Sequence, residues 1–213
     1  MKKSKGRIEL GDITHHNIKQ LKTINQVVFP VSYNDKFYKD VIGSGDLAKL
    51  AYFNDIVVGG VCCRVDVQDG KKRLYIMTLG CLAPYRRQGL GSLMLEHVYE
   101  LCKKDPTIDC ICLHVQVSND GALEFYKRFG FSVLETTKNY YKRIEPADAF
   151  YLEKRLKEGC PPLISVQSAE QPSTVVVSSS ASTNTDDIDV VMQNGVAKED
   201  EEKDNGATSV ETS

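Results

Sequence analysis

The sequence predicts one α/β domain over residues 7–157, followed by a disordered tail over 158–213. Within the domain, short apolar runs typical of strands alternate with stretches in which apolar residues recur at helical spacing. The tail differs in composition, because no aromatic residue follows Tyr151, nine serines occur, and residues 199–204 form an acidic cluster. Such a segment cannot bury enough apolar surface to offset its chain entropy. We expect residues 1–6 to be a flexible N-terminal segment.

The first half of the domain predicts a strand, two helices and a hairpin. Pro30 ends the first helix because proline cannot continue the helical hydrogen-bond pattern. A turn at Asn54 and Asp55 separates two apolar runs, which predicts an antiparallel hairpin. In order, we expect a strand at 7–10, helices at 18–28 and 34–41, and hairpin strands at 47–53 and 56–65.

The second half predicts strands that alternate with two helices. Ala122, Phe125 and Phe129 lie on the buried stripe of the second of these helices, which Gly130 closes as its C-terminal cap. In order, we expect a strand at 73–82, a helix at 90–104, a strand at 110–117, the striped helix, and two strands at 131–136 and 150–156 around a loop at 137–141.

A glycine-rich segment, Arg86-Arg87-Gln88-Gly89-Leu90-Gly91, joins the strand at 73–82 to the following helix. The first N–H groups of a helix have no partner inside it, and the helix dipole adds partial positive charge there. Gly89 and Gly91 lack a Cβ, so an anion can approach the backbone closely. The segment fits neither the P-loop pattern of nucleotide triphosphate sites nor the glycine spacing of dinucleotide folds. It fits [Q/R]-x-x-G-x-[G/A] and so resembles the pyrophosphate-binding loop of the GNAT superfamily.

A second motif, Asn119-x-x-Ala122-x-x-Phe125-Tyr126-x-x-x-Gly130-Phe131, lies at the next junction of strand and helix. Together, and in this order of elements, the two motifs resemble those of the GNAT superfamily of acetyl-CoA-dependent N-acetyltransferases. The similarity covers residues 7–157 and leaves the tail outside. It implies the GNAT fold, in which helices flank a mixed, mostly antiparallel central sheet.

The charge distribution suits an anionic ligand. The net charge of −2 combines +7 for residues 1–157 with −9 for residues 158–213. A basic domain fits a polyanion such as coenzyme A or a docking surface near RNA, and the charge alone does not choose between them.

The resemblance implies acetyl-CoA as cosubstrate and no metal. The residues expected to bind it are Leu79, Gly80, Cys81, Leu82, Arg86, Arg87, Gln88, Gly89, Leu90, Gly91, Ser92, Asn119, Ala122 and Tyr126. Asn119 fits a helix cap as well as a cofactor contact. Tyr126 is a candidate to protonate the departing thiolate, whereas we expect Phe125 to belong to the core.

Two strand residues, Tyr75 and His114, are candidates for acid–base catalysis. A peptide α-amine has a pKa of about 8 and must lose its proton before it attacks the thioester. Period-2 alternation places Cys110, Cys112, His114 and Gln116 on one face of their strand, and Tyr75, Met77, Leu79 and Cys81 on one face of theirs. The resemblance implies that these strands are neighbours and that Tyr75 and His114 remove the amine proton through an ordered water.

His114 suits this role because the ordinary pKa of histidine lies near neutrality, whereas Tyr75 is better suited to orient the water. The backbone N–H of Leu79 is our candidate oxyanion donor. Without the two motifs, packed core residues would be the better interpretation of Tyr75 and His114.

Three further segments, Phe29–Tyr33, Leu74–Leu79 and Asn139–Ile144, resemble those of N-terminal acetyltransferases within the superfamily. The resemblance implies substrates that keep their initiator methionine before an apolar second residue, with lysine side chains as secondary substrates. The residues expected to bind the peptide are Phe29, Pro30, Val31, Tyr33, Met77, Tyr140, Tyr141 and Ile144.

The resemblance also implies nascent polypeptide N-termini as partners, association with the auxiliary and catalytic subunits of a NatA-type complex at the ribosome, and a part in sister-chromatid cohesion. We expect a cytoplasmic and nuclear protein without a membrane span, and no direct nucleic-acid binding. The seven cysteines form no C-x-x-C pair and mostly lie in apolar runs, which predicts buried free thiols.

Two other functions stay open. One is an acetyltransferase for lysine or small amines, and the other is a scaffold subunit whose catalysis has decayed; the intact Tyr75 and His114 argue against the latter. In the tail, the β-branched runs at 175–177 and 187–191 resemble segments that add a strand to a partner's sheet, although an apolar island in a disordered tail is the simpler interpretation.

Overall fold

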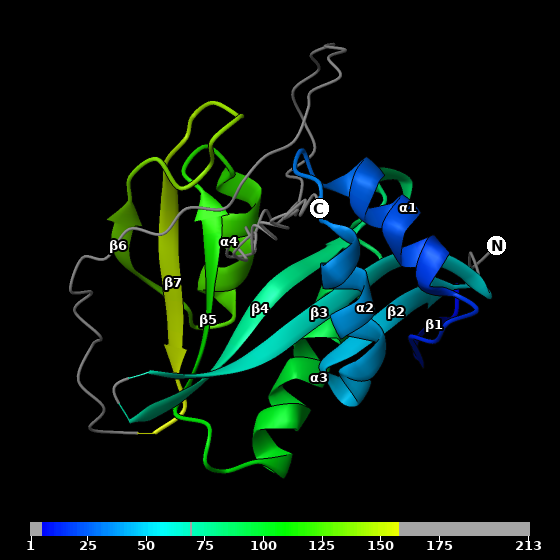
Figure 1. Ribbon diagram of the computed structural model, residues 1–213, viewed down its shortest axis with the longest axis horizontal. Helices are drawn as coiled ribbons and strands as arrows, with labels where there is room; N and C mark the ends of the chain where they lie inside the picture. Colours follow the sequence, from blue (N-terminus) through cyan, green and yellow to red (C-terminus); the bar gives the residue numbers. More distant parts are fainter. Residues whose placement is uncertain (1–5, 69, 158–213) are drawn as a thin grey trace, which may run out of the picture.

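The domain is built on one seven-stranded sheet with helices on both faces, as the computed structural model shows (Figure 1). The structure describes residues 6–68 and 70–157. The predicted tail at 158–213 and most of the predicted flexible segment at 1–6 therefore lie outside the described residues.

The predicted strands and helices are confirmed, with ends that differ by a few residues. The strands are β1 (Ile8–Asp12), β2 (Ala48–Phe53), β3 (Ile56–Gln68), β4 (Lys71–Cys81), β5 (Cys110–Gln116), β6 (Ser132–Thr137) and β7 (Ala149–Arg155). The helices are α1 (Ile18–Val28), α2 (Asp35–Gly43), α3 (Leu90–Lys104) and α4 (Asp120–Arg128), with short 3-10 turns η1 (Gly45–Leu47) and η2 (Ala83–Tyr85).

The strand order is β1-β2-β3-β4-β5-β7-β6. Every neighbouring pair is antiparallel except β4 and β5, which run parallel and are connected through α3. This confirms the mixed, mostly antiparallel sheet. The final strand β7 lies between β5 and β6, so the loop that joins β6 to β7 lies beside the end of β5 (Figure 1).

Helices cover the two faces of the sheet differently. α1 and α2 cover one face of β2 to β4, whereas α3 and α4 pack on the opposite face (Figure 1). Met94 and Leu95 of α3 are fully buried against strand side chains such as Ile76 and Ile111. Each such side chain contributes about 2 kcal/mol through burial, so the core holds the strands in fixed register.

The alternation predicted for β4 is wrong beyond Met77. Pairing with β3 shifts between Cys62, opposite Thr78, and Cys63, opposite Ile76, so Met77 is an extra residue in the ladder. A bulge of this kind turns the following side chains to the other face. Tyr75 and Met77 therefore pack in one core cluster, on the side of α2. Leu79 and Cys81 pack in the other, on the side of α3.

Six of the seven cysteines lie in the described residues, and all six are buried free thiols, as predicted. Cys160 lies outside the described residues. Within residues 6–68 and 70–157, no helix is long and apolar enough to cross a membrane. Over the same residues, no cluster of three or more His, Cys, Asp or Glu side chains could hold a metal ion.

Candidate active site

The site lies where β4 and β5 separate. The two strands pair only as far as Tyr75 and its partner Cys112, although β4 continues to Cys81 and β5 to Gln116. Their C-terminal ends consequently diverge (Figure 1). In the described part of the chain, no strand pairs with β4 on its β5 side beyond Tyr75.

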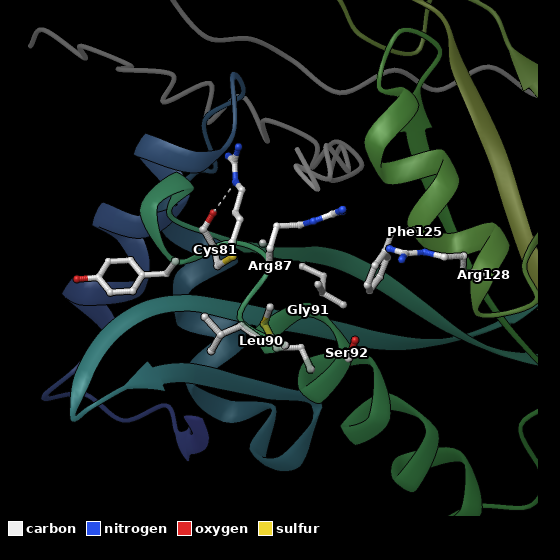
Figure 2. A pocket seen from close by; sticks show the side chains of 13 residues that line it. Cys81, Arg87, Leu90, Gly91, Ser92, Phe125 and Arg128 are labelled. Atoms are coloured by element: carbon white, nitrogen blue, oxygen red, sulfur yellow. Dashed lines mark hydrogen bonds between the residues drawn. The ribbon is translucent and has the colours of Figure 1, made fainter. Parts of the chain in front are cut away.

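A cavity of about 320 Å³ lies beside the glycine-rich loop (Figure 2). Nine of the predicted cofactor residues line it: Leu79, Gly80, Cys81, Arg86, Arg87, Gly89, Leu90, Gly91 and Ser92. The cavity thus joins the end of β4 to the first turn of α3. That is the arrangement predicted for a ligand with a phosphate at one end and an acyl group at the other.

Local backbone geometry makes this loop fit an anion. Gly89 caps α3 with φ +94°, a conformation that favours glycine, and no side chain caps the helix. The N–H groups of the first turn of α3 therefore face the cavity side without a helical acceptor. A Cβ on Gly91 would lie 3.3 Å from the ring of Phe125, so any larger residue there displaces that ring.

Three arginines surround the anion site. Arg86 is held against the end of β4, because its Nε donates to the carbonyl oxygen of Cys81 at 3.4 Å. Arg87 and Arg128 extend toward each other from the loop and from α4 (Figure 2). These guanidinium groups and the partial positive charge at the N-terminus of α3 have the same sign, and together they suit an anion such as a pyrophosphate.

Four lining residues were not predicted: Tyr85, Met94, Phe125 and Arg128. We expected Phe125 in the core, and its low exposure of 4% confirms that it is buried, yet its ring also forms a wall of the cavity. Phe125 and Arg128 are three residues apart on α4 and therefore share a helix face. The sequence did contain a signal for Arg128 as a lining residue, since it is a basic residue three positions after Phe125 of the second motif.

Five of the predicted cofactor residues do not line the cavity: Leu82, Gln88, Asn119, Ala122 and Tyr126. Asn119 acts as the cap of α4, since its Oδ1 accepts a hydrogen bond from the Ala122 N–H at 3.1 Å. Tyr126 is fully buried, and burial raises its pKa well above the ordinary value. It stays a phenol, as a proton donor must, but it is not among the residues that line the cavity.

Tyr75 and His114 lie together, as predicted. The hydroxyl of Tyr75 is 2.9 Å from Nδ1 of His114 and 3.1 Å from the hydroxyl of Tyr140. The Tyr140 ring stacks on the imidazole with centroids 4.2 Å apart and planes 11° apart. Strand pairing fixes the first two side chains, while the β6–β7 loop supplies the third.

Both groups are uncharged at neutral pH. Burial, followed by the nearby Arg64 and Arg73 guanidinium groups, lowers the pKa of His114 to about 3. Burial and the neighbouring Tyr140 raise the pKa of Tyr75 well above its ordinary value. The pKa of His114 therefore lies well below the ordinary histidine value that made it a candidate, and the side chain is a neutral hydrogen-bonding imidazole in desolvated surroundings.

The predicted peptide residues gather from two loops on the same side of the sheet. Phe29 lies over Gly80, because a Cβ atom placed on Gly80 would be 3.0 Å from the Phe29 ring. The Phe29 ring also contacts the Tyr33 ring edge-on, with centroids 6.2 Å apart. Tyr141 is buried and contacts Tyr140 edge-on at 4.9 Å.

Tyr33 is close enough to contribute to the raised pKa of Tyr141, after burial and Tyr140. The loop that follows α1 and the β6–β7 loop are thus brought together. Val31 packs against the core, Met77 is buried beside α2, and Pro30 and Ile144 occupy these two loops.

Residues 18–131 match the acetyltransferase (GNAT) family. N-alpha-acetyltransferase 50 of Danio rerio is 68% identical over 167 residues, which cover 78% of this chain and 99% of that protein. The probable N-acetyltransferase san of Drosophila melanogaster is 62% identical over 158 residues, covering 74% of this chain and 86% of that protein.

Solved structures show the same fold. Arabidopsis thaliana Naa50 in complex with the bisubstrate analogue CoA-Ac-MVNAL has a TM-score of 0.65 at 49% identity, covering 69% of this chain and 97% of that chain. Arabidopsis thaliana NAA60 in complex with acetyl-CoA has a TM-score of 0.63 at 19% identity, covering 70% and 100%, a likeness of fold alone. The chain therefore belongs to the GNAT family of acetyltransferases, and within it to the acetyl-CoA-dependent N-alpha-acetyltransferases.

Proposed function

We propose that this enzyme acetylates the α-amine of peptides that keep methionine before an apolar second residue, and lysine side chains more slowly. The observation that carries the proposal is the contact between the Tyr75 hydroxyl and Nδ1 of His114, at the point where β4 and β5 part. The related Arabidopsis Naa50 was solved with an analogue whose peptide part begins Met-Val, which supports the same substrate class here.

Residues around the cavity hold the cosubstrate. The N–H groups at the start of α3, together with Arg86, Arg87 and Arg128, bind the pyrophosphate of acetyl-CoA. The stretch of β4 beyond Tyr75, where pairing with β5 has ended, lies beside its extended arm, and the Leu79 N–H on that strand is our candidate donor to the thioester oxyanion. Leu79 and Gly80 both line the cavity, so the reacting carbonyl comes close to β4.

Tyr75 and His114 assist removal of the amine proton. Because the pKa of His114 is about 3, the imidazole is neutral and acts as a hydrogen-bond acceptor that orients an ordered water, and this water carries the amine proton to solvent. Tyr75 stays protonated and can donate one hydrogen bond, either to His114 or to a water between the pair and the amine. The stacked Tyr140 ring fixes the imidazole plane and keeps solvent away from it.

The first substrate residue occupies an apolar slot between the two loops. Phe29, Val31 and Met77 form its base, and Tyr140 and Tyr141 close over the peptide backbone. A flexible thioether fills such an irregular slot well, whereas serine or alanine leaves part of it empty. Lysine presents its amine on an unbranched arm, so its acetylation is possible but slower.

The proposal extends to partners and location, which rest on the family resemblance. We propose that the enzyme works in the cytoplasm and nucleus, meets nascent chains at the ribosome, and joins the subunits of a NatA-type complex in a NatE assembly. Copurification of those subunits with the full chain tests this part; their absence after gentle extraction would contradict it.

A matched peptide pair tests the reaction itself. One peptide has a free N-terminal Met-Leu and no lysine, and the other has a blocked N-terminus and one internal lysine. We expect at least tenfold faster acetylation of the free peptide, with mass spectrometry placing the acetyl group on the α-amine. Faster acetylation of the blocked peptide would favour the lysine acetyltransferase instead.

A further inference from the structure

The hairpin of β3 and β4 leaves one strand edge open. β3 pairs with β2 only as far as Cys62, yet β3 continues to Gln68, and the hairpin extends past the helices (Figure 1). Along that edge, residues 63–68 pair with no other strand among residues 6–68 and 70–157. A free edge with open backbone N–H and C=O groups is a template for a further strand.

The two faces of this edge differ in chemistry. Val65 and Val67 lie on one face and are 36% and 72% exposed. On the other face, Arg64 contacts Asp66 through its Nε at 3.0 Å, and Arg73 lies opposite Asp66 in β4. A strand that matches both faces needs apolar residues that alternate with charged ones.

We propose that residues 187–191 of this chain, Asp187-Ile188-Asp189-Val190-Val191, add to the β3 edge as an eighth strand. In an extended segment Ile188 and Val190 share one face and fall beside the two valines of β3. Asp187 and Asp189 share the other face, which carries the ion pair of Arg64 and Asp66 with Arg73 opposite Asp66 in β4. The second β-branched run, 175–177, is valine at every position and provides no such alternation.

The residues between the described domain and this segment are long enough for the segment to reach the β3 edge. The described chain ends at Lys157, whose Nζ lies 2.7 Å from Oδ1 of Asp109. The other carboxylate oxygen of Asp109 accepts a hydrogen bond from the backbone N–H of Lys72 at 2.8 Å, and Lys72 pairs with Val67. The exit point and the open edge are therefore four strand spacings apart across the sheet, about 19 Å.

The intervening residues 158–186 comfortably cover that span. The 29 residues can span up to about 100 Å when fully extended, well above the required distance of about 19 Å. Tethering at this length gives an effective concentration in the millimolar range, of order 1 mM, so even weak strand addition is well populated. This inference does not depend on the acetylation chemistry.

Amide hydrogen exchange of the full chain, followed by NMR, tests the proposal. Alternate N–H groups of a strand point to the same side, so alternate amides of residues 63–68 face the open edge. We expect them to exchange about fivefold more slowly in the unaltered chain than in the double variant Ile188→Asp, Val190→Asp. The matched variant Val175→Asp, Val176→Asp should keep the slow exchange.

A reciprocal change completes the test. Val67→Asp alters an exposed edge residue without touching the core, and it should speed the exchange of the edge amides as the double tail variant does. Equal exchange in the unaltered chain and the Ile188→Asp, Val190→Asp variant overturns the proposal. Slow exchange that depends on protein concentration also overturns it, because a second copy would then be the occupant of the edge.

Discussion

Replacement of Tyr75 by phenylalanine isolates one hydroxyl group. That hydroxyl makes two contacts, with His114 Nδ1 at 2.9 Å and with the Tyr140 hydroxyl at 3.1 Å. The ring itself is 5% exposed and lies 4.7 Å from the Arg64 guanidinium, and both features survive the change. The variant therefore removes the hydrogen-bonding group without creating a cavity.

The expected magnitudes follow from those contacts. Each neutral hydrogen bond contributes about 1 kcal/mol to folding, so loss of both contacts should lower the melting temperature by roughly 4–8 °C. Loss of an acid–base participant costs about 100-fold in kcat, or about 2.7 kcal/mol of transition-state stabilisation. The kinetic loss thus clearly exceeds what slight destabilisation of a folded enzyme could cause.

The assay is steady-state acetylation of a Met-Leu peptide, with acetyl-CoA affinity measured by calorimetry. We expect near-normal cofactor affinity and a similar loss in kcat/KM for peptide and cofactor. Tyr38→Phe is a matched control, because Tyr38 is buried in the same core cluster but does not contact His114 in the described structure. Full activity of Tyr75→Phe would show that the tyrosine is only a packed core residue.

Four further outcomes are expected. His114→Ala should lower kcat about 100-fold with little change in cofactor affinity. Gly91→Val should abolish acetyl-CoA binding in a folded protein, because its side chain must displace Phe125, whereas Gly43→Val, which meets nothing within 4 Å, should bind normally. Burial lowers the pKa of His114 to about 3, below the unfolded value of about 6.5. The free energy of unfolding should therefore fall as the pH drops from about 6.5 toward about 3, because the unfolded chain binds a proton that the folded protein does not. Over this pH range the melting temperature of His114→Gln should decline less than that of the unaltered protein. Truncation after Leu156 should leave the rate on short peptides unchanged, since the described domain includes every proposed catalytic group; a large loss of rate would place a needed residue in the tail.

Local signals explain why the element boundaries were predictable. Pro30, the turn at Asn54 and Asp55, and Gly89 each act within a few residues, and the structure has element ends near all of them. The bulge at Met77 was not predictable in this way, because it arises from how β4 pairs with β3. Its effect is large, since it sends Leu79 and Cys81 to the face opposite Tyr75.

In the candidate site, too, some features were predictable from the sequence and others depend on how the strands and helices pack. Strand alternation and the GNAT resemblance were enough to bring Tyr75 and His114 together. The low pKa of His114 depends on burial and on Arg64 and Arg73, which come from two other strands, so a sequence pattern could not reveal it. Arg128 likewise joins the anion site only because α4 packs beside the start of α3.

Selectivity for the first substrate residue tests the central claim most directly. Two peptides that are identical except for Met-Leu or Ser-Leu at the free N-terminus would be compared at limiting concentration. Each buried methylene is worth about 0.8 kcal/mol, so the apolar slot predicts a kcat/KM for Met-Leu higher by a factor of tens, roughly 20-fold or more. Equal rates, or a preference for Ser-Leu, would contradict the assignment of Phe29, Val31, Tyr140 and Tyr141 to a methionine pocket.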